Sequence, residues 1–75
     1  MKATVSDIKH FVSEFTSDFE FISENCSSVV YKVPHNLTKY FVKCLKFFFK
    51  EVANVSGTPV CTLVDVDTLK ITLVW

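Results

Sequence analysis

Five side chains could support nucleophilic or metal chemistry: Cys26, Cys44, Cys61, His10 and His35. Metal centres bring such ligands together at short spacings such as C-x-x-C or H-x-x-x-H, and neither spacing occurs here. A Cys–His pair can meet through folding alone, but a chain with one glycine has few loops for an oxyanion hole or a substrate cleft. The sequence therefore predicts no metal site, no catalytic residue and no enzyme, but three buried reduced thiols and two surface imidazoles.

The charged residues are balanced, with eight lysines, no arginine and eight acidic residues. This balance argues against a generally basic nucleic-acid-binding protein, since arginine is favoured for contacts to phosphates and bases. The many Phe and Lys residues and the few Gly and Pro residues also fit an AT-rich coding sequence, such as that of a virus or a parasite. Because the chain lacks a glycine-rich phosphate loop, we predict no cofactor.

One group of charges is nevertheless concentrated. Residues 26–54 carry five lysines against one glutamate, whereas residues 1–25 carry two lysines against five acidic residues. Four of these lysines recur at steps of four, three and four, so on a helix they form a stripe about 16 Å long. Such a stripe could be a solvated face, or it could face an acidic protein or a phosphate backbone. The lysine stripe consists of Lys39, Lys43, Lys46 and Lys50.

Several apolar side chains fall outside the faces expected to form the core. Val42 and Phe47 flank the lysine stripe, Phe21 lies off the apolar face of the first helix, and Trp75 ends the chain on an uncharged stretch, residues 72–75. Exposed aromatic residues bordered by charges are typical of contact surfaces. Uncharged sheet edges likewise favour strand pairing, either in a homodimer or with a partner.

The leading hypothesis is a non-enzymatic protein-interaction module that uses the aromatic and lysine surface of the second helix or an open sheet edge. Its partner is another protein or a second copy of the chain. The alternative is weak, electrostatic binding of nucleic acid, RNA included, by the lysine stripe. Four phosphate contacts would give a salt slope of only about −3.6.

Length and hydropathy limit what can be expected of the number of domains, membrane segments and location of the protein. The 75 residues form one small domain, 1–75, which can belong to a longer polypeptide. No signal peptide is visible, and no apolar run reaches the ~18 residues of a membrane span. With an odd number of widely spaced cysteines, the sequence predicts a cytoplasmic or nuclear protein.

The elements that must position these residues follow from periodicity. Apolar residues recur at three- and four-residue steps over 5–24, which predicts an amphipathic helix. Phe21 breaks that pattern, so residues 18–23 could instead begin a strand that forms a hairpin with the next segment. A strand is predicted over 28–33, which ends before Pro34.

A second helix is predicted over 37–53, with Asn36 as its N-cap and Gly57 just beyond its end. Alternation predicts a C-terminal hairpin with strands over 59–64 and 68–75. The expected fold is α+β in two layers, with both helices on one face of a three-stranded mixed sheet in the order α-β-α-β-β. The strand at 18–23 would change this order to α-β-β-α-β-β. The sequence shows no internal repeat.

Overall fold

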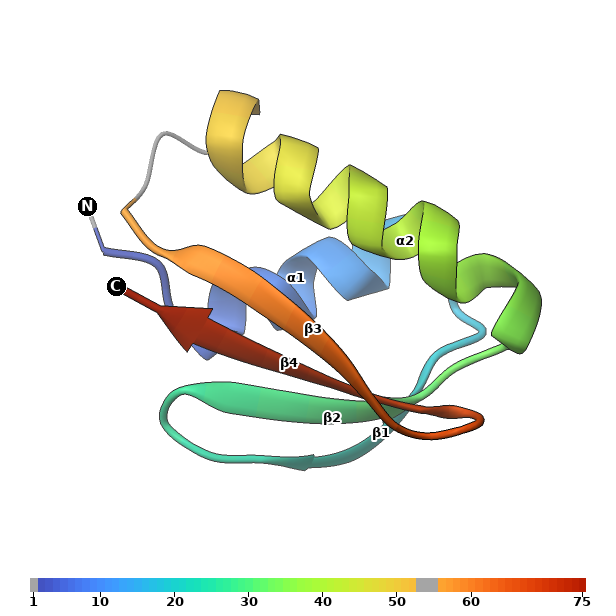
Figure 1. Ribbon diagram of the computed structural model, residues 1–75. Helices are drawn as coiled ribbons and strands as arrows, with labels where there is room; N and C mark the ends of the chain where they lie inside the picture. The colour runs from blue at the N-terminus through green and yellow to red at the C-terminus, as the bar shows by residue number, and fades with distance from the viewer. Residues whose placement is uncertain (1, 53–55) are drawn as a thin grey trace.

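Two helices cover one face of a four-stranded antiparallel sheet (Figure 1). The computed structural model describes residues 2–52 and 56–75. The strands lie in the order β1-β2-β4-β3, so β1 and β3 form the two edges. The elements are α1 (Val5–Phe15), β1 (Glu20–Glu24), β2 (Ser28–Lys32), α2 (His35–Phe47), its π-helical continuation η1 (Phe48–Val52), β3 (Thr58–Asp65) and β4 (Thr68–Val74).

The α+β class is confirmed, and the order α-β-β-α-β-β is the alternative predicted from the sequence. The three-stranded mixed sheet was wrong, because the first helix ends at Phe15 and not at residue 24. Thr16 has extended backbone angles, and its hydroxyl accepts a hydrogen bond from the Asp18 amide at 3.0 Å, which turns the chain out of the helix. Phe21 then lies opposite Tyr31 in the β1–β2 ladder, which accounts for its departure from the helical pattern.

The crossover from β2 through α2 to β3 would join two parallel strands if these were neighbours in the sheet. β2 and β3 do run parallel, because each is antiparallel to β4, but β4 lies between them. The predicted C-terminal hairpin is confirmed, with the Asp65 carboxylate accepting the Val66 amide at 2.7 Å in its turn. Asn36 is not the N-cap of the second helix, since the helix begins at His35 after Pro34.

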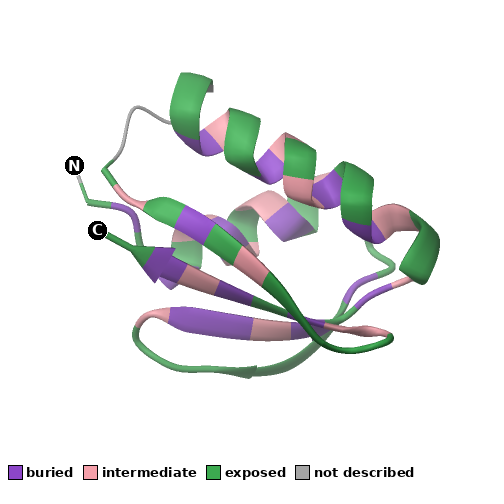
Figure 2. Ribbon diagram, viewed as in Figure 1, coloured by how far each residue is buried: buried purple, intermediate pink, exposed green. Residues whose placement is uncertain are grey.

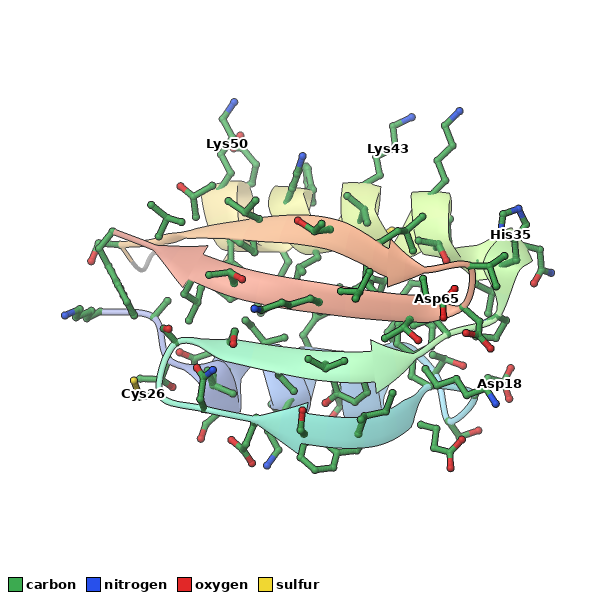
Figure 3. The ribbon with its side chains drawn as sticks, turned by 60° about the horizontal axis from the view of Figure 1, so that its bottom comes forward. Asp18, Cys26, His35, Lys43, Lys50 and Asp65 are labelled. Atoms are coloured by element: carbon green, nitrogen blue, oxygen red, sulfur yellow. The ribbon has the colours of Figure 1, made fainter. Side chains whose placement is uncertain are left out.

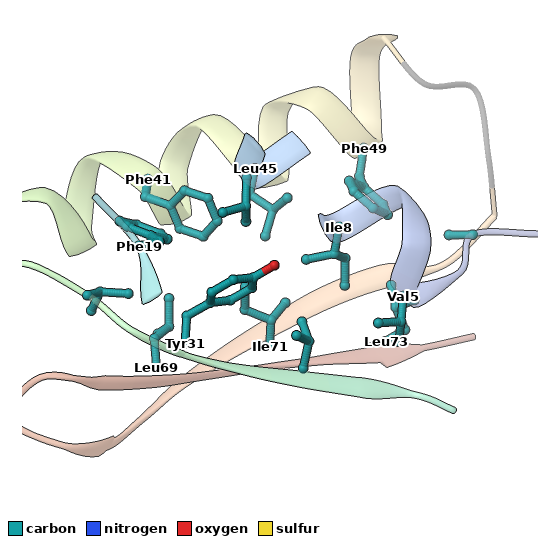
Figure 4. Packing of buried hydrophobic residues seen from close by; sticks show 14 residues of the cluster. Val5, Ile8, Phe19, Tyr31, Phe41, Leu45, Phe49, Leu69, Ile71 and Leu73 are labelled. Atoms are coloured by element: carbon teal, nitrogen blue, oxygen red, sulfur yellow. The ribbon is translucent and has the colours of Figure 1, made fainter. Parts of the chain in front are cut away.

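The core lies between the helices and the sheet (Figures 2 and 4). Alternation along β4 buries Leu69, Ile71 and Leu73, whereas Trp75, which the same alternation predicts to face inward, is half exposed. Phe41 and Leu45 reach the same layer from α2, and both are completely buried. The remaining buried apolar residues are Ala3, Val5, Ile8, Val12, Phe19, Val29, Tyr31, Val33 and Phe49.

The sheet contains a two-fold repeat that was not visible in the sequence. Val30 lies opposite Lys70, and a two-fold axis between them relates β2 to β4 with an offset of 40 residues. Glu20 and Phe21 of β1 correspond in the same way to Val60 and Cys61 of β3, before the bulge in β1 shifts the register. A helix precedes each hairpin. The inward-facing positions of β2 and β4 share burial and hydrophobicity but not identity, so the repeat is one of pattern alone. The related buried pairs are Val29 with Leu69, Tyr31 with Ile71, and Val33 with Leu73.

Candidate protein-interaction surface

An apolar groove runs between the two helices. It has a volume of about 670 Å³ and is lined only by helix residues, so it opens on the side away from the sheet. We call it the interhelix groove. Its lining residues are Phe11, Glu14, Phe15, Tyr40, Lys43, Cys44, Phe47 and Phe48.

The floor of the interhelix groove is a chain of aromatic contacts that begins in the core. The ring of Phe15 lies 5.3 Å from that of the buried Phe41 and 5.7 Å from that of Tyr40. The ring of Phe11 lies 5.1 Å from that of Phe48, on the opposite helix. Because aromatic pairs of this kind are stabilising, contacts within the molecule hold the floor of the groove in place.

Two aromatic side chains rise from this floor into solvent. Phe47 and Tyr40 are each 61% exposed, although both border an apolar groove. Burial of a side chain such as Phe stabilises by roughly 1.5–3 kcal/mol, so an exposed phenylalanine forgoes that stabilisation. This pair is the feature of the helix layer that a contact with another protein would explain.

The rim of the interhelix groove carries opposite charges on its two sides. Glu14 lies on the α1 side, with its carboxylate 3.8 Å from the His10 imidazole, and Lys43 lies on the α2 side. A hydrogen bond with the Cys44 thiol raises the pKa of the Tyr40 hydroxyl. The groove is thus apolar inside, with an acidic and a basic wall.

The structure brings only some of the predicted interface residues together. Lys43 and Phe47 line the interhelix groove, whereas Val42 is half-buried against the core. Phe21 lies at the β1 edge, with its ring 6.0 Å from that of Tyr31 and 5.2 Å from the Lys9 ammonium. The predicted interface residues therefore do not form one continuous surface.

Trp75 is also engaged within the molecule. The Lys2 ammonium lies 4.4 Å from the centre of its ring, and Gly57 packs against its indole. Trp75 is half exposed but lies at the far end of the sheet from the β3–β4 turn, so it does not contribute to the interhelix groove.

The four lysines of the stripe are all exposed, as predicted. Figure 3 shows Lys43 and Lys50 extending away from the sheet. Lys43 borders the interhelix groove, and Lys39, Lys46 and Lys50 border cavities between α2 and β3. Lys39, Lys43 and Lys46 also border a shared cavity lined by α2 alone, so the stripe connects the two surfaces.

The cysteines and histidines are dispersed. Nowhere in residues 2–52 and 56–75 do three His, Cys, Asp or Glu side chains gather where they could hold a metal ion. The prediction of three buried thiols was wrong for Cys26, which is exposed in the β1–β2 turn (Figure 3) because a hairpin replaces the predicted helix end there. Cys44 and Cys61 are partly buried. Burial raises the pKa of Cys61 from 9.0 to about 11, although Lys46 acts in the opposite direction.

The differences in exposure and pKa among the cysteines predict the order in which they react. At neutral pH the thiolate fraction of Cys61 should be about 100-fold lower than that of an ordinary cysteine, because its pKa is about two units higher. Cys26 should be alkylated first by iodoacetamide and Cys61 last, as measured by mass spectrometry of tryptic peptides. The rate at Cys61 should still be rising near pH 10. If Cys61 reacted faster than free cysteine, it would be an activated nucleophile and the non-enzymatic interpretation would fail.

Of the eight residues that line the groove, sequence reasoning identified only Lys43 and Phe47 as interface residues. Phe11, Phe15, Tyr40 and Phe48 were assigned to the apolar faces of the two helices, and they do extend from the core. The available signal was the width of the apolar arc on the second helix, which exceeds what one sheet face can cover.

Comparisons with known protein families, with curated proteins and with solved structures give no match for the chain. In the part of the chain that the structure describes, neither helix is long and apolar enough to cross a membrane. The functional argument therefore rests on the surfaces of this molecule alone.

Proposed function

We propose that the protein is a non-enzymatic interaction module that self-associates through its helix layer. The observation that carries this proposal is the interhelix groove, with Phe47 and Tyr40 standing exposed beside an apolar floor. In a two-fold dimer, Phe47 of each copy enters the groove of the other. This arrangement buries the two side chains that the monomer leaves in water.

The charges on the rim favour a second copy over an unrelated partner. Glu14 and Lys43 lie on opposite walls of the same groove. Two-fold symmetry makes an interface self-complementary, so Lys43 of one copy would face Glu14 of the other across each groove. A partner with one sign of charge would match only one wall.

The interface would be a small one. The broad face of the molecule extends over 32 by 22 Å, about 700 Å² in projection, which is slightly below the roughly 800 Å² that a standard interface takes from each partner. Dimerisation would leave the sheet on the outside of the assembly, because the groove opens away from the sheet.

Sedimentation equilibrium tests the proposal directly. The wild-type protein should form dimers at concentrations between about 1 µM and 1 mM, the range of a weak to moderate interface. Phe47→Ala should weaken the dimer by about 30-fold, the effect expected of a hot-spot aromatic residue. Val66→Ala is the matched control, because Val66 is an exposed apolar residue in the β3–β4 turn, away from the helices.

A charge-swap experiment tests the two-fold geometry. Glu14→Lys and Lys43→Glu should each weaken the dimer, whereas the double variant should restore it, since the opposed pairs are then re-formed with reversed sign. A protein that remains monomeric at about 1 mM, or whose dimer tolerates Phe47→Ala unchanged, does not associate through this surface.

Nucleic-acid binding is the second candidate function, because the lysine stripe is exposed. Fluorescence titration with single-stranded RNA and duplex DNA at about 50 mM salt would reveal it, because electrostatic binding is strongest at low salt. A salt slope close to about −3.6 that falls with each lysine removed would favour this candidate over self-association.

A further inference from the structure

The two edges of the sheet differ. β1 is five residues long, contains a bulge and carries Glu20 and Glu24. Edge strands that are short, bulged and charged are protected against pairing. β3 is eight residues long and uncharged from Thr58 to Val64. Within the described residues, no strand pairs with its outer side.

The direction of the β3 backbone groups follows from the ladder. The Leu73 amide donates to the Ser27 carbonyl at 2.8 Å, so odd-numbered residues of β4 face β2 and even-numbered residues face β3. The partners of the even-numbered residues are Val60 and Thr62, whose amides and carbonyls therefore point toward β4. By alternation, the amide and carbonyl groups of residues 61 and 63 and the carbonyl of residue 59 point outward.

A groove accompanies this edge. Two cavities, of about 630 and 440 Å³, lie in line between α2 and β3. We call them together the edge groove. No Asp or Glu is among its lining residues. These are His35, Asn36, Thr38, Lys39, Val42, Cys61, Leu63 and Leu69 around the larger cavity, and Lys46, Phe49, Lys50, Gly57, Thr58 and Pro59 around the smaller.

The two-fold repeat shows why this groove is open. Phe21 and Cys61 are related by the offset of 40 residues, since they lie opposite Tyr31 and Ile71 in their hairpins. At the β1 edge, the phenyl ring of Phe21 and the Lys9 side chain occupy the space beside α1, and Lys9 is fixed by a 2.7 Å ion pair with Glu24. At the β3 edge, the smaller Cys61 leaves the corresponding space beside α2 empty.

The charges around the edge groove select its occupant. Lys39, Lys46 and Lys50 line it without an acidic neighbour in the lining, so an acidic segment is complementary. A second copy paired through β3 would place the same three lysines of both copies against one another, which is repulsive. The β1 edge of a second copy is acidic, but it is short and bulged.

We propose that β3 accepts an extended acidic segment of a partner protein as a fifth strand of the sheet. The backbone of the segment pairs with the outward groups of residues 61 and 63. Its alternate side chains, which are small and apolar, enter the edge groove beneath α2, and its Asp and Glu side chains lie near Lys39, Lys46 and Lys50. This is β-strand addition, in which main-chain hydrogen bonds supply affinity and pockets for alternate side chains supply specificity.

The experiment is a titration with a short fluorescein-labelled peptide of alternating valines flanked by Asp and Glu. Fluorescence anisotropy should show saturable binding, and hydrogen exchange measured by NMR should show that the amides of Cys61 and Leu63 become protected. A peptide with Lys in place of the acidic residues should bind at least about tenfold more weakly. A peptide with N-methylated alternate residues should not bind, since it lacks the main-chain donors.

Two variants of the protein test the geometry. Cys61→Pro removes an outward amide without removing a β4 hydrogen bond, as Pro59 already does two residues earlier, and should abolish peptide binding. If Cys61→Pro fails to fold, Lys46→Glu decides, because it changes an exposed helical residue and should weaken binding about fivefold. Lys70→Glu, the same charge change on the open face of the sheet, should leave binding unchanged.

Several outcomes would overturn the proposal. Binding that leaves the amides of Cys61 and Leu63 unprotected would do so, and so would equal binding of acidic and basic peptides. Stronger protection of these amides by RNA than by the acidic peptide would also do so, as would the formation of head-to-tail polymers of the protein. The result is separable from the helix-layer dimer, because Phe47→Ala should weaken the dimer and leave peptide binding intact. A monomeric protein that binds the peptide would refute the dimer alone.

Discussion

Phe41→Ala is expected to remove about 3–5 kcal/mol from the free energy of unfolding, the usual cost of deleting a buried aromatic side chain. Phe41 is completely buried, and its ring lies 4.7 Å from that of Phe19, 5.3 Å from Phe15 and 5.7 Å from Phe11. A domain of this length typically has only about 4–11 kcal/mol of stability. The variant should therefore be close to unfolding at room temperature.

Urea denaturation followed by circular dichroism measures this effect. With a slope of about 1 kcal/mol per molar urea, the midpoint should fall by about 3 M or more. Phe47→Ala is the matched control on the same helix, because Phe47 is 61% exposed and its removal should cost the monomer less than about 0.5 kcal/mol. Equal losses for the two variants would mean that Phe41 does not occupy the centre of the core.

Gly57→Ala is expected to destabilise the protein by about 1–3 kcal/mol, the range for a strained backbone conformation. Gly57 has a φ of 124°, which residues with a side chain rarely adopt. An added Cβ would also lie 3.1 Å from Trp75 Nε1 and 3.2 Å from the Cβ of Ala3. Backbone strain and crowding therefore act in the same direction.

The two causes can be separated by chemical synthesis of a chain of 75 residues. D-alanine at position 57 accepts the positive φ, so it should recover the part of the loss that arises from backbone strain. A double-mutant cycle of Gly57→Ala with Trp75→Ala isolates the contact with the indole. If both L-alanine and D-alanine at this position preserved the urea midpoint, neither the strain nor the close approach would be present.

The sequence was sufficient for the α+β class, the C-terminal hairpin, the second helix and the inward face of β4. Those elements show one dominant periodicity, as in the alternation that buries Leu69, Ile71 and Leu73. The sequence was not sufficient between residues 16 and 24, where Phe15 and Phe19 have the spacing of a helix and Phe19 and Phe21 have the alternation of a strand. A local hydrogen bond of Thr16 and the pairing of Phe21 opposite Tyr31 decide between them, and the second is a long-range contact.

The candidate surfaces were less predictable than the fold. Phe47 and Lys43 were identified because they fall outside the apolar face of one helix. Phe11 and Phe15 were not identified, because they lie on the apolar face of α1. Whether a residue on that face is covered depends on how closely the second helix packs against it. The edge groove depends on the size difference between Phe21 and Cys61 at related positions, and that comparison has meaning only once the ladder registers are known.

The two-fold repeat of the sheet also bears on the cooperativity of folding. The β1–β2 and β3–β4 hairpins meet at the β2–β4 ladder, and an isolated two-stranded hairpin is marginally stable at best in water. Separating the halves would expose an apolar face on each hairpin and the shared core between them. We therefore expect the two halves to fold and unfold together, with the β2–β4 ladder around Val30 and Lys70 as the junction between them.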